Sequence, residues 1–327
     1  MDLTPSDDQT ALVNAARVML GERMPTDVLR ATFACTSAID QPFWSACADM
    51  GWFSLGLPDD GGAEYGLADE ALLLREAGRV LAPGPLVATM VGARLAAVAG
   101  EDALSERIAA GAAPVAAAIV GGADLLLVDA PSATHVLAIG ADRADLYPVA
   151  ALGDVVERRG IDEAARVSSA RLDGPPAASV HGAAANDLAL RASVLTASLL
   201  AGVSAGVRDM AVQHAKVREQ FGAPIGVNQA VKHKCADMAV RTEAAECLVL
   251  FAALAVEEGR ADGAELVAAA RVIASDAALH GARDNIQIHG GMGFTDESDA
   301  HLYLKRAHLL DRMFGAPAVQ RRILVAS

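Results

Sequence analysis

The stretch VREQFGAPIGVNQ, Val217 to Gln229, joins the two longest helical patterns of this 327-residue chain. Before it, apolar residues recur every three or four positions, or at twice that spacing, from Leu188 to Met210, and after it a second stripe runs from Val231 to Ala252. This period is that of an amphipathic helix, and the glycines and proline between the stripes interrupt it. The pattern therefore predicts two long helices joined by a short turn, with Asn228 placed to cap the second helix.

A second glycine-rich stretch, QIHGGMGF from Gln287 to Phe294, follows a third predicted helix over residues 264–288. A dinucleotide-binding fingerprint would follow a strand and open a helix, so this position excludes a Rossmann site. Glycines at a helix end act as a plain cap, or they expose backbone to another chain or to a phosphate group. The residues alone leave both interpretations open. Further helices are expected from about Ser298 and from Pro317.

The rest of the chain predicts a mainly α-helical protein with a small central β-domain. Thr4-Pro5-Ser6-Asp7 has the signature of a helix start, with Thr4 as the cap and Pro5 at the first helical position. Helical periodicity continues to about residue 100, with loops at 55–62 and 83–85. Short apolar runs then predict strands at 115–120, 125–128, 134–139 and 167–172. The predicted domains are an N-terminal helical domain at 1–113, a shortened β-domain at 114–182 and a C-terminal helical bundle at 183–327.

Composition narrows the classes of function. Asp and Glu outnumber Lys and Arg by 41 to 27, and the resulting formal charge of −14 disfavours nucleic-acid binding. The first residues hold no basic segment followed by an apolar core, and no stretch reaches the ~20 uncharged apolar residues of a membrane span. Cys35, Cys47, Cys235 and Cys247 lack the CxxC spacing of metal sites and predict reduced thiols. We therefore expect a cytoplasmic protein that binds neither nucleic acid nor membrane.

The two glycine-containing stretches resemble motifs of the acyl-CoA dehydrogenase family. Its members carry an arginine-x-x-phenylalanine-glycine turn after the first C-terminal helix, then proline-isoleucine and a glutamine opening the next helix, as in Val217–Gln229. They also carry a glutamine-x-x-glycine-glycine-x-glycine turn after the third helix, as in Gln287–Gly293. The resemblance spans residues 1–327, and near the N-terminus it rests on Gly51-Trp52, Leu57-Pro58, Gly61-Gly62, Glu76, Gly78 and Arg79.

The resemblance implies a helical N-terminal domain, a β-domain and a C-terminal four-helix bundle, with FAD bound at a subunit interface. The family removes the α-proton and the β-hydride of an acyl-CoA thioester, and the hydride goes to the flavin. The neighbouring subunit holds the adenine and pyrophosphate half of FAD. Arginine suits pyrophosphate, and glycines let backbone approach a cofactor. The residues matched to this role are Arg218, Gln220, Phe221, Gln229, Gln287, Gly290 and Gly291.

The flavin side of the resemblance is incomplete. The family's threonine-glutamate-proline and glycine-serine-aspartate motifs are replaced by a direct run from Ala116 to Asp124, which predicts a missing cradle for the isoalloxazine ring. The usual catalytic glutamate falls at Phe314, and the alternative base position falls near Ala192. No catalytic residue is therefore predicted in this chain. Asp187 and Asp311 are nearby in sequence, and we expect both to be solvated or capping residues.

No other chemistry is indicated. His280 and His289, and His301 and His308, lack the i, i+4 spacing that a metal pair on a helix favours, so no metal site is predicted. The resemblance points to the smaller, base-lacking subunit of heterotetrameric actinobacterial steroid-degrading acyl-CoA dehydrogenases, with a paralogous partner subunit and an acyl-CoA substrate. Two alternatives stay open: a self-sufficient homo-oligomeric dehydrogenase with an unrecognised base, and a flavin-free scaffold of the same fold.

Overall fold

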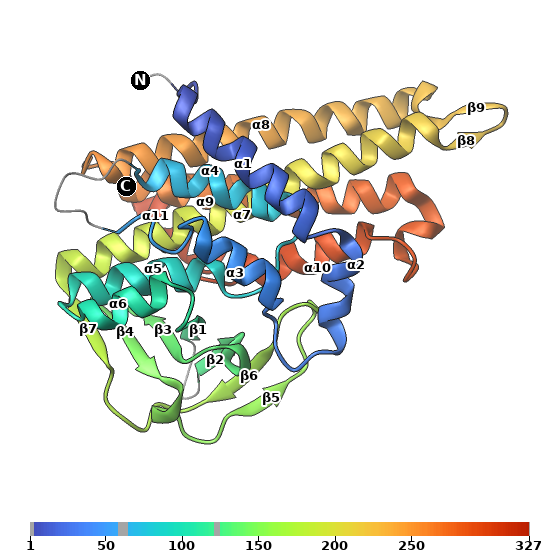
Figure 1. Cartoon of the computed structure of the whole chain (residues 1–327). Helices are drawn as coiled ribbons and strands as arrows, with labels where there is room; N and C mark the ends of the chain where they lie inside the picture. The colour runs from blue at the N-terminus through green and yellow to red at the C-terminus, as the bar shows by residue number, and fades with distance from the viewer. Residues whose placement is uncertain (1–2, 58–64, 121–124, 327) are drawn as a thin grey trace.

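The computed structural model describes residues 3–57, 65–120 and 125–326, in which the helices pack together and a seven-stranded sheet lies along one side of them (Figure 1). The helices before the sheet are α1 (Asp7–Arg23), α2 (Thr26–Ala31), α3 (Gln41–Asp49), α4 (Leu67–Arg79), α5 (Leu86–Val98) and α6 (Asp102–Ala109). The strands are β1 (Val115–Val120), β2 (Leu125–Val128), β3 (His135–Ile139), β4 (Arg143–Pro148), β5 (Val156–Arg158), β6 (Val167–Ala170) and β7 (Ala178–His181). The remaining elements are α7 (Gly182–Val217), β8 (Glu219–Gln220), β9 (Ala223–Pro224), α8 (Gln229–Glu257), α9 (Gly263–His289), α10 (Ala300–Leu310) and α11 (Pro317–Ala326).

The fold class predicted from the sequence, mainly helical with a small β-region, is confirmed, but two helix caps differ from expectation. The cap of α1 is Ser6 and not Thr4, because Ser6 Oγ accepts a bond from the Gln9 N–H (3.1 Å) while Gln9 Oε1 accepts one from the Ser6 N–H (3.0 Å). This reciprocal pair satisfies two free backbone groups at once. Asn228 occupies the cap position of α8, but its side chain donates to the Ile225 carbonyl (3.0 Å) and does not cap the helix.

The sheet has the order β5-β6-β2-β1-β3-β4-β7, and every pairing is antiparallel except β1 with β3. Strands β1 and β2 have the predicted bounds, and β3 and β6 are shorter than predicted. Strands β4, β5 and β7 were not predicted. β5 is exposed along its whole length, so no apolar pattern marks it in the sequence. The expected turn at Pro58–Gly62 and the residues 121–124 of the expected cradle lie outside the described residues.

Helices α4 and α7 pack against each other so closely that backbone touches backbone. A Cβ added at Gly78 of α4 would lie 2.2 Å from the carbonyl oxygen of Leu199, and one added at Gly202 of α7 would lie 2.0 Å from that of Arg75. No side chain fits in either gap, because real Cβ atoms do not come within 3 Å of another heavy atom. Two glycines in different segments therefore set the distance between these helices.

The buried charge on α4 near this contact is paired. Glu76 is 2% exposed and binds Arg17 of α1 (2.9 Å) and its neighbour Arg75 (2.8 Å). Burial alone would raise the pKa of Glu76, but the bonds to the two guanidinium groups lower it. Glu76 therefore stays ionised inside the protein and ties α1 to α4.

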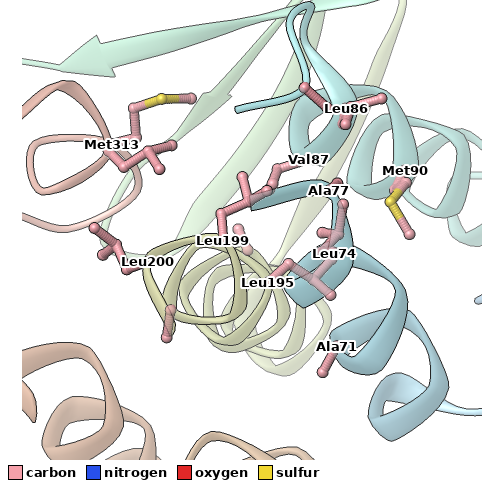
Figure 2. Close-up of a cluster of buried hydrophobic side chains, with 14 of the residues drawn as sticks. Ala71, Leu74, Ala77, Leu86, Val87, Met90, Leu195, Leu199, Leu200 and Met313 are labelled. Carbon is pink, nitrogen blue, oxygen red and sulfur yellow. The ribbon is translucent and has the colours of Figure 1, made fainter. Parts of the chain in front are cut away.

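One hydrophobic core contains residues of the N-terminal helices, the sheet and the C-terminal helices. It joins Leu74 of α4 and Leu86 of α5 with Leu195 of α7 (Figure 2). Leu146 of the sheet belongs to the same core. Helix α7 lies at its centre, next to α4, α5, α8, α9 and the sheet. The division into domains at 1–113, 114–182 and 183–327 stays a prediction.

Helix α7 is the one helix in the described ranges that is long and apolar enough to cross a membrane by length and composition alone. Its most apolar window is 89% buried inside the protein, as in the core helix of a globular fold. The four cysteines are free thiols.

We predict that Gly202→Ala lowers the free energy of unfolding by about 1–3 kcal/mol, because the new methyl group overlaps the Arg75 carbonyl and forces α4 and α7 apart. Gly21→Ala in α1 is the matched control, since a Cβ there meets nothing within 4 Å. Alanine is the better helix former, so the control should be neutral or stabilising by about 0.5–1 kcal/mol. Urea unfolding of both variants measures the difference. Equal losses would contradict the close approach.

Candidate functional site

The end of α7 and the start of α8 are joined by a hairpin arm, residues 218–228, that projects from the end of the bundle (Figure 1). The Arg218 N–H donates to the His214 carbonyl (2.9 Å) and closes α7. Glu219 then pairs with Pro224, and Gln220 pairs with Ala223. The two residues between them both have positive φ, which suits the right-handed twist of a two-residue hairpin.

Phe221, at the tip of the arm, is strained and unsupported by its own chain. Its φ is 53°, unusual for a residue other than glycine, asparagine or aspartate, and its exposed fraction is 107%. A large apolar side chain at positive φ strains the backbone, and because this ring is exposed it gains no stabilisation from burial. The part of the chain that the structure describes offers no burial that would offset this cost.

The Gln287–Gly291 turn lies where α9 ends and a 3-10 turn at Gly290–Phe294 begins. Gly290 closes the helix with a φ of 64°, so the plain cap interpretation accounts for this glycine. It does not account for Gly291, whose φ is not positive and where an added Cβ would meet nothing within 4 Å. The open space beside Gly291 leaves backbone accessible from outside the chain.

A pair of stacked histidines brings the hairpin arm and the Gln287–Gly291 turn together. The ring centroids of His214, one turn before Arg218, and His289, next to Gly290, lie 3.9 Å apart at an interplanar angle of 25°. His289 Nδ1 lies 2.9 Å from the Asn285 carbonyl oxygen, within hydrogen-bond distance. From the sequence, His289 was considered only as a metal ligand and His214 was missed, because only the crossing of α7 and α9 places the rings together.

All seven predicted FAD contacts are exposed, and they lie at the two stretches that the histidine pair joins. Within the described part of the chain, the Arg218 guanidinium forms no ion pair, and Gln220 Nε2 donates to the carbonyl of its neighbour Glu219 (2.8 Å). A free guanidinium, open backbone and an unsupported phenyl ring fit the pyrophosphate and adenine half of FAD. The roles of Arg218, Gln220, Phe221, Gln229, Gln287, Gly290 and Gly291 stay predictions.

The segment after α10, where the family's base would lie, is held by a buried arginine. Arg271 of α9 is 1% exposed, and its Nη2 donates to the carbonyls of Leu310 (3.3 Å), Met313 (2.9 Å) and Gly315 (3.3 Å). Burial lowers the pKa of Arg271 to about 10, so the side chain keeps its charge at neutral pH. Phe314 within this segment has a φ of 48° and is half-buried, and Ala192, at the other base position, is fully buried.

The interior beside Met313, the neighbour of Phe314, is lined mainly by apolar side chains. Leu86 and Val87 of α5, Leu199 of α7 and Met313 line a cavity of about 40 Å³ (Figure 2). A cavity of this size holds about three water molecules at most. The described residues therefore leave no room there for a flavin ring or an acyl chain.

The acidic residues near the two base positions are paired with an arginine, buried or hydrogen-bonded to backbone. Asp187 is 38% exposed in its side chain and pairs with Arg191 (3.1 Å). Asp311 is the C-cap residue of α10, and its N–H donates to the Ala307 carbonyl (3.0 Å). Its side chain is only 5% exposed, so of the two expectations the capping position is confirmed and the solvated side chain is wrong. Asp129 lines the small cavity and accepts a bond from the Arg166 N–H (2.8 Å), and burial raises its pKa to about 6.

Comparison with known proteins identifies the family. Residues 6–114 match the acyl-CoA dehydrogenase N-terminal domain, and residues 187–327 match the acyl-CoA dehydrogenase C-terminal domain. The chain is 32% identical to acyl-CoA dehydrogenase IpdE2 of Mycobacterium tuberculosis over 98% of each chain. This chain belongs to the acyl-CoA dehydrogenase family. It is also 38% identical to FadE34 of the same organism, over 84% of this chain but only 40% of FadE34.

Solved structures of the family have the same fold over nearly the whole length. A variant of the Tcur3481-Tcur3483 steroid ACAD is 25% identical with a TM-score of 0.84, covering 98% of this chain and 97% of that chain. The ChsE4-ChsE5 complex from Mycobacterium tuberculosis gives a TM-score of 0.86 at 20% identity, covering 100% and 98%. The family is FAD-dependent, and its solved members include an FAD complex of PigA, so the prediction of FAD as the cofactor is confirmed.

We predict that Phe221→Asn leaves the free energy of unfolding of the isolated chain unchanged, or raises it by up to about 1 kcal/mol. Asparagine tolerates positive φ, and the ring makes no contact that would be lost. Phe53→Ala is the control, because Phe53 is 1% exposed and its truncation should cost about 3–5 kcal/mol. Thermal melts and urea titrations test both. A strong destabilisation by Phe221→Asn would mean that the chain itself uses the ring.

Proposed function

We propose that this chain is the cofactor-completing subunit of a heteromeric acyl-CoA dehydrogenase. It would hold the adenine and pyrophosphate half of FAD, while a paralogous subunit supplies the flavin cradle, the acyl-CoA pocket and the base. One contrast carries the proposal. The matched FAD residues are exposed at one end of the bundle, whereas the cavity beside Met313 measures only about 40 Å³ and neither base position holds an acid.

Three residues of the exposed group have a definite task in this proposal. Arg218 offers a charged donor fork to the pyrophosphate, and the open backbone at Gly291 lets phosphate oxygens approach. Phe221 offers an apolar surface to the adenine. FAD, when bound, supplies the acceptor for the β-hydride of the acyl-CoA thioester.

The relatives support a partner and a substrate class. One similar structure is described as a steroid ACAD and its description names two proteins, and another is described as the ChsE4-ChsE5 complex. We extend both features to this chain and propose a heterotetramer with a paralogous subunit, acting on a steroid-derived acyl-CoA in the cytoplasm.

The self-sufficient enzyme remains the second candidate, and Asp129 is the observation that favours it. This carboxyl group lines the cavity beside Met313, and its raised pKa would suit an acid–base role near neutral pH. Against it, Asp129 is 4% exposed and accepts a backbone hydrogen bond, which gives it a structural role. Copurification separates the candidates: a paralogous chain with half-stoichiometric flavin, flavin with one chain only, or no flavin for a scaffold.

We predict that Arg218→Ala lowers the FAD affinity of the two-subunit complex about tenfold or more, since a charge-assisted contact contributes about 1.5–3 kcal/mol. Arg159→Ala is the control, because Arg159 is an exposed arginine after β5 in the central sheet region. Flavin fluorescence on equilibrium dialysis gives both affinities. An unchanged affinity in Arg218→Ala would remove the arm from the cofactor site.

We predict that the isolated chain binds little FAD and that Phe314→Glu does not give it dehydrogenase activity. A carboxylate at this position has no hydride acceptor beside it, because the cavity beside the neighbouring Met313 is too small for the flavin ring. Dye reduction with acyl-CoA measures activity, and absorbance measures bound flavin. A yellow, stoichiometric homo-oligomer, or turnover by Phe314→Glu alone, would favour the self-sufficient enzyme.

A further inference from the structure

The stacked pair His214–His289 lies between the two elements that carry the proposed FAD contacts. His214 belongs to the last turn of α7, and its carbonyl receives the Arg218 N–H that closes the helix (2.9 Å). His289 is the last residue of α9 and is followed directly by Gly290. A displacement of either ring therefore moves one element of the site relative to the other.

The His289 ring is fixed on two sides. Its Nδ1 lies 2.9 Å from the Asn285 carbonyl, which can only accept, so Nδ1 carries the proton that is donated in this bond. Asn285 is fully buried and donates from Nδ2 to Met210 Sδ (3.2 Å), so it is itself held in place. The other side of the ring is covered by His214 at 3.9 Å.

The groups that act on His214 are His289 from α9, stacked on its ring, and Arg218 at the end of its own helix. Burial is the main cause of the lowered pKa of His214, and His289 and Arg218 lower it further. His214 therefore resists protonation while no anion is present, and an anion beside Arg218 would offset the repulsion by its guanidinium.

We propose that His214 and His289 are positioning residues that hold the hairpin arm against the Gln287–Gly291 turn, and that binding of a diphosphate group between them is coupled to proton uptake by the pair. The inference rests on the proposed function, because it takes the diphosphate to be that of FAD. The proton comes from solvent and is added to an imidazole nitrogen of the pair, with no bond broken in the ligand. The binding of a diphosphate should therefore tighten as the pH falls from 8 to 6.

The experiment uses the isolated full chain and ADP as the probe. Histidine NMR titrations with and without saturating ADP, assigned with single variants of the pair, should show the proton affinity of the pair rising about tenfold, one pKa unit, when ADP is bound. Calorimetry in two buffers of different ionisation enthalpy should show proton uptake. His233→Gln is the control, because His233 is exposed on α8 outside the stack.

Two substitutions at one position separate stacking from protonation. His214→Phe keeps a flat ring but cannot titrate, so ADP affinity at pH 8 should stay within about twofold of the unsubstituted chain. Its pH dependence should fall to that caused by the terminal phosphate of ADP, which itself takes up a proton between pH 8 and 6. His214→Ala removes the ring, and affinity should fall about tenfold at every pH. An unchanged affinity in His214→Ala, a pH dependence that persists undiminished in His214→Phe, or no ADP-dependent shift at all would overturn the inference.

The same measurements distinguish this failure from failure of the proposed function. If Arg218→Ala lowers the flavin affinity of the complex but the histidine variants do not change ADP binding, the cofactor role stands and the histidine role is wrong. If ADP binding depends on the pair but no flavin-binding complex forms with a paralogous chain, the diphosphate site stands and the partner proposal is wrong.

Discussion

Backbone contact between α4 and α7 is the constraint on which the rest of the structure depends. Gly78 and Gly202 admit carbonyl groups where any side chain would collide, so the two helices lie closer than ordinary side-chain packing allows. Leu199, whose carbonyl faces Gly78, turns its side chain into the small cavity and helps to close the interior there (Figure 2). Arg271 fixes the neighbouring segment around Met313 by binding three of its carbonyls. The filled interior is thus a consequence of helix packing and of one buried guanidinium.

The C-terminal end of α7, unlike the filled interior, is exposed and carries cationic side chains. Lys216, Arg218 and Lys232 are exposed around the hairpin arm, although the whole chain carries a formal charge of −14. Glu219 is the exposed acid among these cations, which would still attract an anion to the proposed diphosphate site. The strained, exposed Phe221 stands at the tip of the same arm. A closed interior and an open, cationic bundle end together agree with a subunit that contributes to a site in another chain.

Local patterns were enough to predict much of the fold. The period of apolar residues located α9 to within one residue at each end, Pro317 marked the start of α11, and β1 and β2 were predicted with their observed bounds. Residue types and spacing from Arg218 to Gln229 pointed to the family. Each of these features depends on neighbours within a few residues along the chain, so a pattern can reveal it.

Other features exist only through contacts between distant segments. β5 has no buried residue and forms because β6 pairs with it, and the rings of His214 and His289 meet only because α7 and α9 cross at that point. Asp311 is likewise buried although it stands at a helix end. The small cavity beside Met313 depends on side chains from several separate elements. Such contacts depend on the distances between segments, which the close approach of backbone at Gly78 and Gly202 helps to set. The periodicity within a single segment therefore does not predict them.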